Sequence, residues 1–146
     1  MAVVYTLDAS VIVTAFSPDE RDFDASFRLL GQLLERGLPL VEPSLLIPEI
    51  GATLGRRQTG TVLARRFVEQ VAGLPGLNLI TLDAVLAREA AALAINQRLR
   101  GADAVYAAVA LRFGATLVTR DREQMERTRA VTATLSPAEA LTALEP

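Results

Sequence analysis

The sequence predicts one α/β domain of three layers, α/β/α, with a central and mostly parallel sheet of four to five strands. Short apolar runs alternate along the chain with longer segments of helical spacing, which is typical of such domains. The chain has 146 residues, and 51% of them are hydrophobic, enough for one sizeable core but not for two. No repeat, low-complexity segment or linker divides it. We therefore expect residues 1–146 to form a single domain.

The first half of the chain contains two predicted strands and three predicted helices. The apolar run Val3–Leu7 is typical of a strand buried on both faces, and this start of the chain lacks the basic residues of a signal peptide. A second short strand is predicted at Leu38–Val41. The helices are predicted at 23–36, 44–57 and 60–72, the first with a buried stripe of Phe23, Phe27, Leu30 and Leu34, and the second capped by Ser44.

The second half continues the alternation. Gly114 is placed to end one helix, and Ser136 begins a capping box whose glutamate is Glu139. The predicted strands are Leu77–Thr81, Thr116–Thr119 and a last short one at Val131–Thr134, and the predicted helices follow Asp83, span Asp103–Phe113 and follow Ser136.

Three residue types are missing, and their absence excludes several chemistries. The chain has no histidine, cysteine or lysine. Acid–base chemistry must therefore use carboxylates, metal-bound water or tyrosine, and thiolate or histidine metal sites are excluded. P-loop nucleotide hydrolysis and Schiff-base chemistry are excluded because both need lysine. The net charge of −2 argues against a broad basic surface for nucleic acid, so any such binding must be local.

Two aspartates directly follow predicted strands. Asp8 comes after the first strand and Asp121 after the fourth. Because parallel strands present their carboxyl ends at one edge of a sheet, the two carboxylates are expected to face one another if the strands are neighbours. Close like charges are unfavourable unless a proton or a cation is shared between them. Each aspartate also fits a simpler role as the N-cap of the helix that follows it.

Two further acids complete a candidate cluster. Asp103 lies in the first turn of a helix that is otherwise apolar, and Glu49 lies within an apolar helical stretch. The simpler alternatives are a favourable interaction of Asp103 with the helix dipole and an exposed position for Glu49. Together the four acids offer only oxygen ligands, which Mg²⁺ and Mn²⁺ prefer. Such a site can activate water and orient a phosphodiester without histidine, cysteine or lysine.

The acids lie in four motifs whose order covers nearly the whole chain. The motifs are Leu7–Val11, Pro43–Glu49, Arg100–Ala110 and Gly114–Asp121. In this order they resemble the PIN domain family, and within it the VapC-type toxins of type II toxin–antitoxin systems.

The resemblance implies an endoribonuclease that cuts RNA to leave 5′-phosphate and 3′-hydroxyl ends. By position, it implies that Mg²⁺ or Mn²⁺ is held by Asp8, Glu49, Asp103 and Asp121. Ser10 and Thr119 match positions that often line the same pocket, and they equally fit ordinary capping or strand-end hydroxyls. Glu123 is the candidate for a further acid, and it equally fits a solvated helix. After Asp121 the family often has a second aspartate and an aromatic residue, whereas this chain has Arg122-Glu123-Gln124-Met125.

The arginines near the acids are candidates for binding RNA phosphates. The residues predicted to do so are Arg100, Arg120 and Arg122, and a second group further away consists of Arg56, Arg57, Arg65 and Arg66. The alternative for both groups is a set of solvated helix faces paired with glutamates. The acidic segment Ser17–Asp24 is expected to be a solvated loop outside the site.

The resemblance also implies partners: an RNA substrate, a cognate antitoxin and a second copy of the chain. The helices around Leu29–Leu34 and Val62–Val71 could form the antitoxin groove or simply belong to the core. We expect a cytoplasmic protein, because the absence of cysteine suits a reducing compartment. No apolar stretch approaches the 18 residues or so that a membrane helix requires, so a membrane span is not expected. The competing interpretations are a PIN-like binding scaffold without catalysis and a structure-specific DNA nuclease. A phosphorylatable receiver-like module would require the lysine that this chain lacks.

Overall fold

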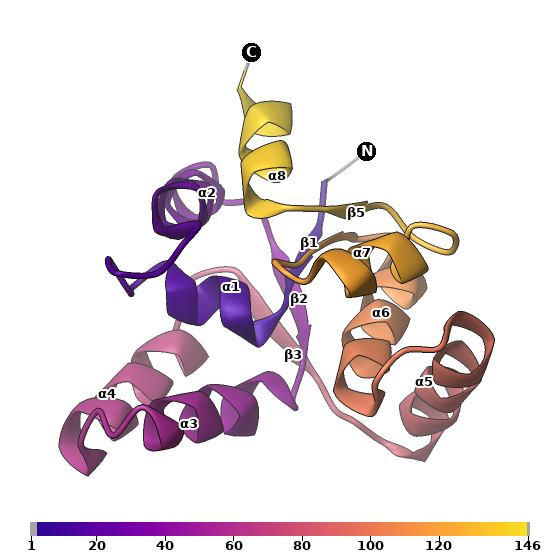
Figure 1. Cartoon of the computed structure of the whole chain (residues 1–146), viewed down its shortest axis with the longest axis horizontal. Coiled ribbons are helices and arrows are strands. Elements are labelled where there is room, and N and C mark those ends of the chain that lie inside the picture. Colours follow the sequence, from indigo (N-terminus) through magenta and orange to yellow (C-terminus); the bar gives the residue numbers. More distant parts are fainter. Residues whose placement is uncertain (1–2, 146) are drawn as a thin grey trace.

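The centre of the molecule is a sheet of five parallel strands, which confirms the predicted three-layer α/β/α fold (Figure 1). The coordinates are a computed structural model, and they describe residues 3–145. The strands are β1 (Tyr5–Leu7), β2 (Leu40–Pro43), β3 (Leu77–Ile80), β4 (Thr116–Val118) and β5 (Thr134–Leu135).

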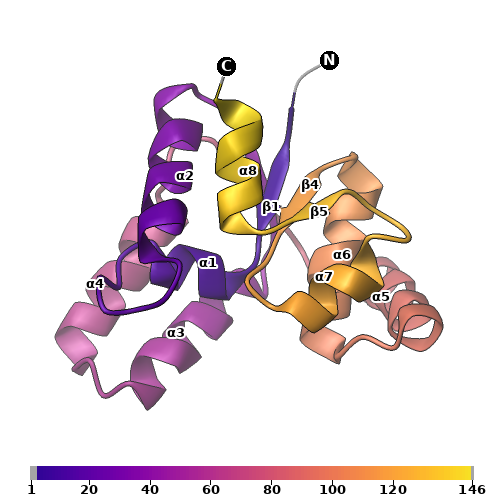
Figure 2. The same ribbon diagram turned by 45° about the horizontal axis from the view of Figure 1, so that its top comes forward.

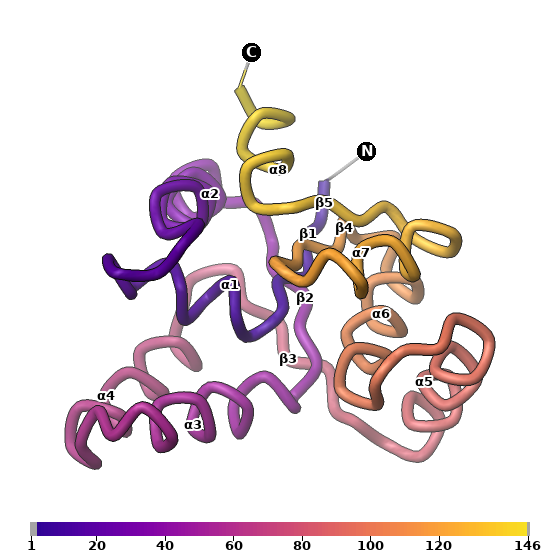
Figure 3. Tube along the Cα trace, viewed as in Figure 1, coloured from indigo at the N-terminus to yellow at the C-terminus, as the bar shows by residue number. Residues whose placement is uncertain are grey.

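The strand order is β3-β2-β1-β4-β5, so the chain builds outward from β1 in both directions. The tube in Figure 3 shows the path: the chain passes from β1 to β2 and β3 on one side and later returns to β4 and β5 on the other. In open parallel sheets, ligands bind beyond the carboxyl ends of the strands where this direction reverses. Here that point lies between β1 and β4, the strands that precede Asp8 and Asp121.

Helices cover both faces of the sheet. In Figure 2, α1, α2 and α8 lie on one side of the strands, and α5, α6 and α7 lie on the other. The helices are α1 (Ala9–Thr14), α2 (Phe23–Glu35), α3 (Leu46–Arg56), α4 (Thr61–Ala72), α5 (Ala84–Gln97), α6 (Gly101–Phe113), α7 (Arg122–Thr128) and α8 (Pro137–Leu144). Among residues 3–145, none of these helices combines the length and apolar character needed to cross a membrane.

Helix α6 is the buried centre of its layer. Every residue of Ala104–Ala110 is buried, and the helix packs across β1, β2 and β4. Its four alanines in this stretch let the helix approach the sheet closely while β-branched and aromatic residues fill the remaining space. The helix ends at Gly114, whose φ of 62° is the left-handed conformation that glycine adopts at low cost. Because α6 is held so firmly, Asp103 in its first turn has a fixed position.

Local capping signals were predicted with mixed success. Asp83 caps α5, and the capping box of Ser136 and Glu139 is present at α8, as predicted. Ser44, however, does not cap α3. Its hydroxyl accepts a hydrogen bond from the Leu82 backbone, and α3 begins after Leu45 without a side-chain cap.

The predicted strand at Leu38–Val41 begins two residues too early. Leu38 N donates to Leu33 O, and Gly37 N donates to Leu34 O, so residue 38 completes the end of α2 rather than starting β2. The last strand is also shifted, from Val131–Thr134 to Thr134–Leu135, because Val131 N is still bonded to the end of α7.

The predicted buried stripe of α2 was partly wrong. Leu30 is buried as predicted, but Phe27 is 54% exposed, and the other buried residues of the helix are Ser26, Leu29 and Leu33. A helix after Asp8 was one of the alternatives in the sequence, but six residues are too few to show a period, so no bounds were predicted for α1.

Candidate active site

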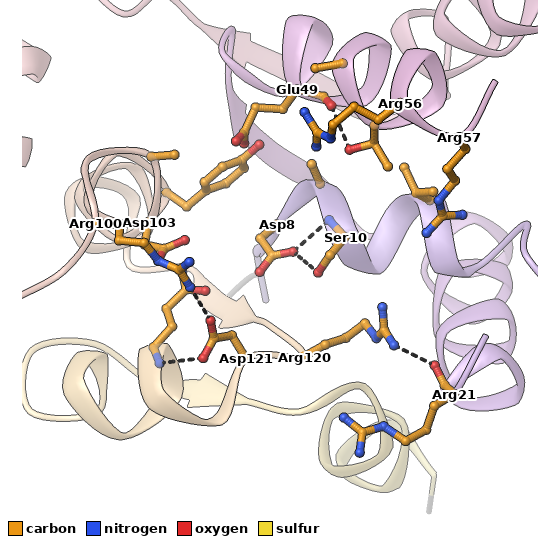
Figure 4. Close-up of a pocket in the computed structure, with 17 residues that line it drawn as sticks. Asp8, Ser10, Arg21, Glu49, Arg56, Arg57, Arg100, Asp103, Arg120 and Asp121 are labelled. Carbon is orange, nitrogen blue, oxygen red and sulfur yellow. Dashed lines mark hydrogen bonds and ion pairs between the residues drawn. The ribbon is translucent and has the colours of Figure 1, made fainter. Parts of the chain in front are cut away.

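A pocket of about 560 Å³ lies beyond the carboxyl ends of β1 and β4, and all four predicted acids line it (Figure 4). Asp8 follows β1, Asp121 follows β4, Asp103 lies in the first turn of α6, and Glu49 lies in the first turn of α3. The fold thus brings four acids from distant parts of the sequence to one cavity.

Asp8 is held by hydrogen bonds from two directions. Its Oδ1 accepts from the backbone N and the hydroxyl of Ser10 and caps α1, while its Oδ2 accepts from the Thr119 hydroxyl at 2.6 Å. Asp8 therefore both caps α1 and lines the pocket, two roles that were alternatives from the sequence alone. Ser10 and Thr119 both orient this carboxylate.

Thr119 connects Asp8 to a residue that the sequence did not indicate. Its hydroxyl oxygen lies 2.8 Å from the side-chain oxygen position of Gln124 and accepts from Asp121 N at 3.1 Å. A hydroxyl has one proton, and Asp8 takes it, so Gln124 makes a consistent bond only when its amide NH₂ faces Thr119. The other amide atom is buried and has no partner among the described residues, although Gln124 lines the pocket.

The Gln124 side chain thus offers one polar atom to a ligand or water in the pocket. Its position could not be read from Arg122-Glu123-Gln124-Met125, because a glutamine within a charged run is expected to be exposed.

Asp103 and Asp121 share a single arginine. Arg100 donates to Asp121 Oδ2 at 2.7 Å and to Asp103 Oδ2 at 3.3 Å (Figure 4). Burial raises the pKa of Asp103, Arg100 lowers it, and the negative charges of Asp8 and Asp121 raise it further. The three aspartates are therefore close enough for their charges to repel, and a cation placed among them relieves that repulsion.

Glu49 lies on the opposite side of the pocket, near Tyr106. Burial raises the pKa of the Tyr106 phenol far above its ordinary value, and the nearby Glu49 raises it further. Tyr106 therefore stays protonated and cannot act as a base. Of the three groups that the composition left for acid–base chemistry, carboxylates and metal-bound water remain.

The residues of the pocket fit a divalent cation by their chemistry. Its acids supply only oxygen, and Arg100 already places a positive charge against two of them, Asp103 and Asp121. With the side chains as they stand, no three acids within residues 3–145 converge closely enough to hold a metal ion. Direct contact of one cation with three of the acids would therefore require rotation of side chains, and a cation shared by Asp103 and Asp121 would displace Arg100 from them.

Two arginines near the pocket are bound within the protein. Arg120 donates to Asp22, Thr14 and the Arg21 carbonyl, and it is only 18% exposed. Arg57 similarly donates to Glu20 and Ser17. The segment Ser17–Asp24, expected to be a solvated loop, is therefore tied to the pocket wall by these arginines.

The remaining arginines differ in their access to the pocket. Arg56 lines it, its guanidinium points into it in Figure 4, and it has no hydrogen bond or ion pair within the described chain. Arg122 is exposed and does not line the pocket. Glu123 is exposed, pairs with Arg127 and faces a smaller neighbouring pocket that Asp103 and Asp121 also line.

The PIN domain family matches residues 5–131. Among curated proteins, none matches the chain.

Three of the similar solved structures cover nearly the whole chain. The structure of PAE2754 from Pyrobaculum aerophilum is 27% identical, with a TM-score of 0.69 over 99% of this chain and 96% of that one. VapBC2 from Rickettsia felis, bound to a DNA fragment from its promoter, is 15% identical, with a TM-score of 0.69 over 92% and 98%. A toxin–antitoxin complex from Klebsiella pneumoniae is 18% identical, with a TM-score of 0.64 over 92% and 98%.

The match over residues 5–131 includes every strand except β5 and all four acids of the pocket. The chain belongs to the PIN domain family.

Proposed function

We propose that the protein is an endoribonuclease that depends on Mg²⁺ or Mn²⁺ and acts as the toxin of a toxin–antitoxin pair. The observation that carries the proposal is the gathering of Asp8, Glu49, Asp103 and Asp121 around one pocket at the switch point of the sheet. Membership of the PIN family supports nuclease chemistry, and similar structures that contain toxin–antitoxin complexes support the toxin role.

The four carboxylates would hold the cation, and the cation would supply a water of lowered pKa and positive charge for the phosphodiester. Ser10 and Thr119 fix Asp8, so their hydroxyls keep one ligand in position. With its NH₂ turned toward Thr119, the unpartnered atom of Gln124 is a carbonyl oxygen, which can accept a hydrogen bond from a water but cannot bond a phosphate oxygen. Glu123 would contribute only from the neighbouring pocket.

Arg56 is the arginine best placed to bind an RNA phosphate, because its guanidinium points into the pocket and is unpaired there. Arg100 would join it once a metal ion replaces its contacts with Asp103 and Asp121. Arg120 would act through the loop that it holds, and Arg122 would contact RNA only outside the pocket.

The partners follow from the same proposal. An antitoxin would bind this chain, and the similar toxin–antitoxin complex supports such a partner. Two copies of the chain would form a homodimer in the cytoplasm. An antitoxin group that neutralises the acidic pocket would inhibit the enzyme, since the pocket already accommodates a guanidinium.

The test is cleavage of a panel of cellular RNAs, single-stranded DNA and duplex DNA by the purified protein, with Mg²⁺, Mn²⁺ or EDTA. The variant Asp8→Asn, Asp103→Asn is expected to lose RNA cleavage, because two neutral amides do not supply the negative charge with which the carboxylates hold a divalent cation. The control is Asp24→Asn, which makes the same kind of substitution once, at an exposed position on α2 outside the pocket. The proposal is supported if the wild type and Asp24→Asn cut RNA in a metal-dependent way and the double variant does not.

Two results would contradict it. Cutting of DNA in preference to RNA would make the protein a DNA nuclease. Failure of the wild type to cut any substrate after removal of copurifying protein would favour the binding scaffold.

A further inference from the structure

A fifth carboxyl group, that of Glu42 on β2, is completely buried beneath the site. Its side chain has no exposed surface, and its Oε1 accepts a hydrogen bond of 2.6 Å from the backbone N of Leu7. Leu7 is the last residue of β1 and directly precedes Asp8. Glu42 therefore contacts the backbone that places a central acid of the pocket.

Glu42 occupies a point where the pairing of β1 with β2 changes. The two strands begin a regular parallel ladder, in which Tyr5 N donates to Pro39 O at 3.1 Å. The next step of that ladder would bring Leu7 N to Val41 O. Val41 O instead accepts from the Thr6 hydroxyl at 2.7 Å, and Leu7 N donates to Glu42. Two side chains thus replace one backbone bond.

The other side of β1 keeps its ladder through the same region. Leu7 is paired with Val118, and Asp8 N donates to Val118 O at 3.1 Å. The final residues of β1 are therefore held by the β4 backbone on one side and by a side chain from β2 on the other. A buried N–H without a partner is costly, so the loss of Glu42 would release this second attachment.

The state of the Glu42 carboxyl group agrees with this role. Burial raises its pKa well above the ordinary value, although the Leu7 N–H lowers it in part. Its second oxygen is buried and has no hydrogen-bond partner within residues 3–145, which disfavours a negative charge there. An uncharged acid and a glutamine amide offer the same acceptor to Leu7, so Glu42→Gln is a conservative replacement.

We infer that Glu42 is a positioning residue, which holds the last N–H of β1 and so fixes Asp8 for binding the divalent cation. This inference rests on the proposed function, because it takes Asp8 to be a metal ligand. Glu42 lies outside all four acidic motifs, so the inference gives β2 a role in the site that the motifs did not indicate.

The test is direct titration of the metal-free protein with Mn²⁺, with binding followed by the electron paramagnetic resonance of free Mn²⁺. The temperature is kept below the unfolding transition of every variant. Glu42→Met fills a similar volume without an acceptor, and we expect Mn²⁺ affinity to fall about tenfold or more, as for other losses of groups that orient metal ligands. Glu42→Gln is expected to bind Mn²⁺ as the wild type does.

Two further variants separate positioning from stability. Glu42→Asp keeps a carboxyl group but shortens the side chain, and we expect it to weaken Mn²⁺ binding like Glu42→Met. It also serves if Glu42→Met does not fold. Leu141→Ala removes a buried side chain from α8, and it is expected to lower the unfolding temperature without changing Mn²⁺ affinity.

The outcomes separate the inference from the proposed function. Wild-type Mn²⁺ affinity in folded Glu42→Met or Glu42→Asp would overturn the inference and leave the proposed function intact. Weakened binding in Glu42→Gln would overturn it too, as would an equal loss in Leu141→Ala. Absence of Mn²⁺ binding by the wild type would contradict both.

Discussion

The two sides of β1 hold the same strand in different ways. Toward β4, three residue pairs are in parallel register, and backbone bonds continue to Asp8 N. Toward β2, one pair is in register, and the end of the strand is then held by the side chains of Thr6 and Glu42. The strand that precedes Asp8 is therefore held by backbone hydrogen bonds on the β4 side and by side-chain hydrogen bonds on the β2 side.

The difference indicates which substitutions each side tolerates. Backbone bonds between β1 and β4 survive a change of side chain, so on that side only groups that reach the acids should matter. On the β2 side the hydrogen bonds belong to side chains, so substitutions there remove the attachment itself. Four predictions test this contrast.

The largest effect is expected from Thr119→Val, on the β4 side. The backbone ladder would remain, but Asp8 would lose a hydrogen bond of 2.6 Å, and the link to Gln124 would be broken. We expect Mn²⁺ affinity to fall about 10- to 100-fold, as for other groups that orient metal ligands. The control is Thr134→Val, which removes a buried hydroxyl from β5 away from the pocket. Equal Mn²⁺ affinities in the two variants would show that Thr119 is not needed to orient Asp8.

A smaller effect of opposite sign is expected from Arg100→Gln. The guanidinium contacts Asp103 and Asp121, and a metal ion must displace it. Because Arg100 is largely exposed, the gain in Mn²⁺ affinity should be modest, by a factor of roughly two to five at low salt. Arg112→Gln, which breaks an ion pair with Glu89 far from the acids, serves as the control. A fall in Mn²⁺ affinity would instead mean that Arg100 organises the acids for the metal.

The contrast also shows what the sequence could predict. Asp8 and Asp121 were found because an acid after an apolar strand is a local signal, and parallel strands bring such residues together. Glu42 also directly follows a predicted strand, Leu38–Val41, but its hydrogen bond to Leu7, 35 residues away, could not be read from the sequence. From the sequence, Arg120 was likewise ranked above Arg56 as a phosphate contact, because the sequence could not show that Arg120 is bound by the loop that contains Asp22.

Glu42→Gln tests the β2 side through the pH dependence of stability. In the folded protein the pKa of Glu42 is raised, so its contribution to stability is fully present below about pH 4.5 and is lost as pH rises through the folded value. Glutamine keeps the acceptor but does not ionise. The stability of Glu42→Gln relative to the wild type should therefore increase with pH.

The measurement is urea denaturation of both proteins in EDTA at pH 5 and pH 8. A difference between the two proteins that is the same at both pH values would mean that burial does not raise the pKa of Glu42.

The smallest effect is expected from Thr6→Val, which tests whether the whole β2 side positions the site or only Glu42. The variant removes the donor to Val41 O and should lower the free energy of unfolding by about 1 kcal/mol. Leu7 N keeps its bond to Glu42, so Mn²⁺ affinity should stay at the wild-type value. Urea denaturation and the Mn²⁺ titration measure the two quantities. Both variants leave the β4 ladder unchanged. If Thr6→Val weakened Mn²⁺ binding as much as Glu42→Met, the whole attachment of β1 to β2, and not Glu42 alone, would position Asp8.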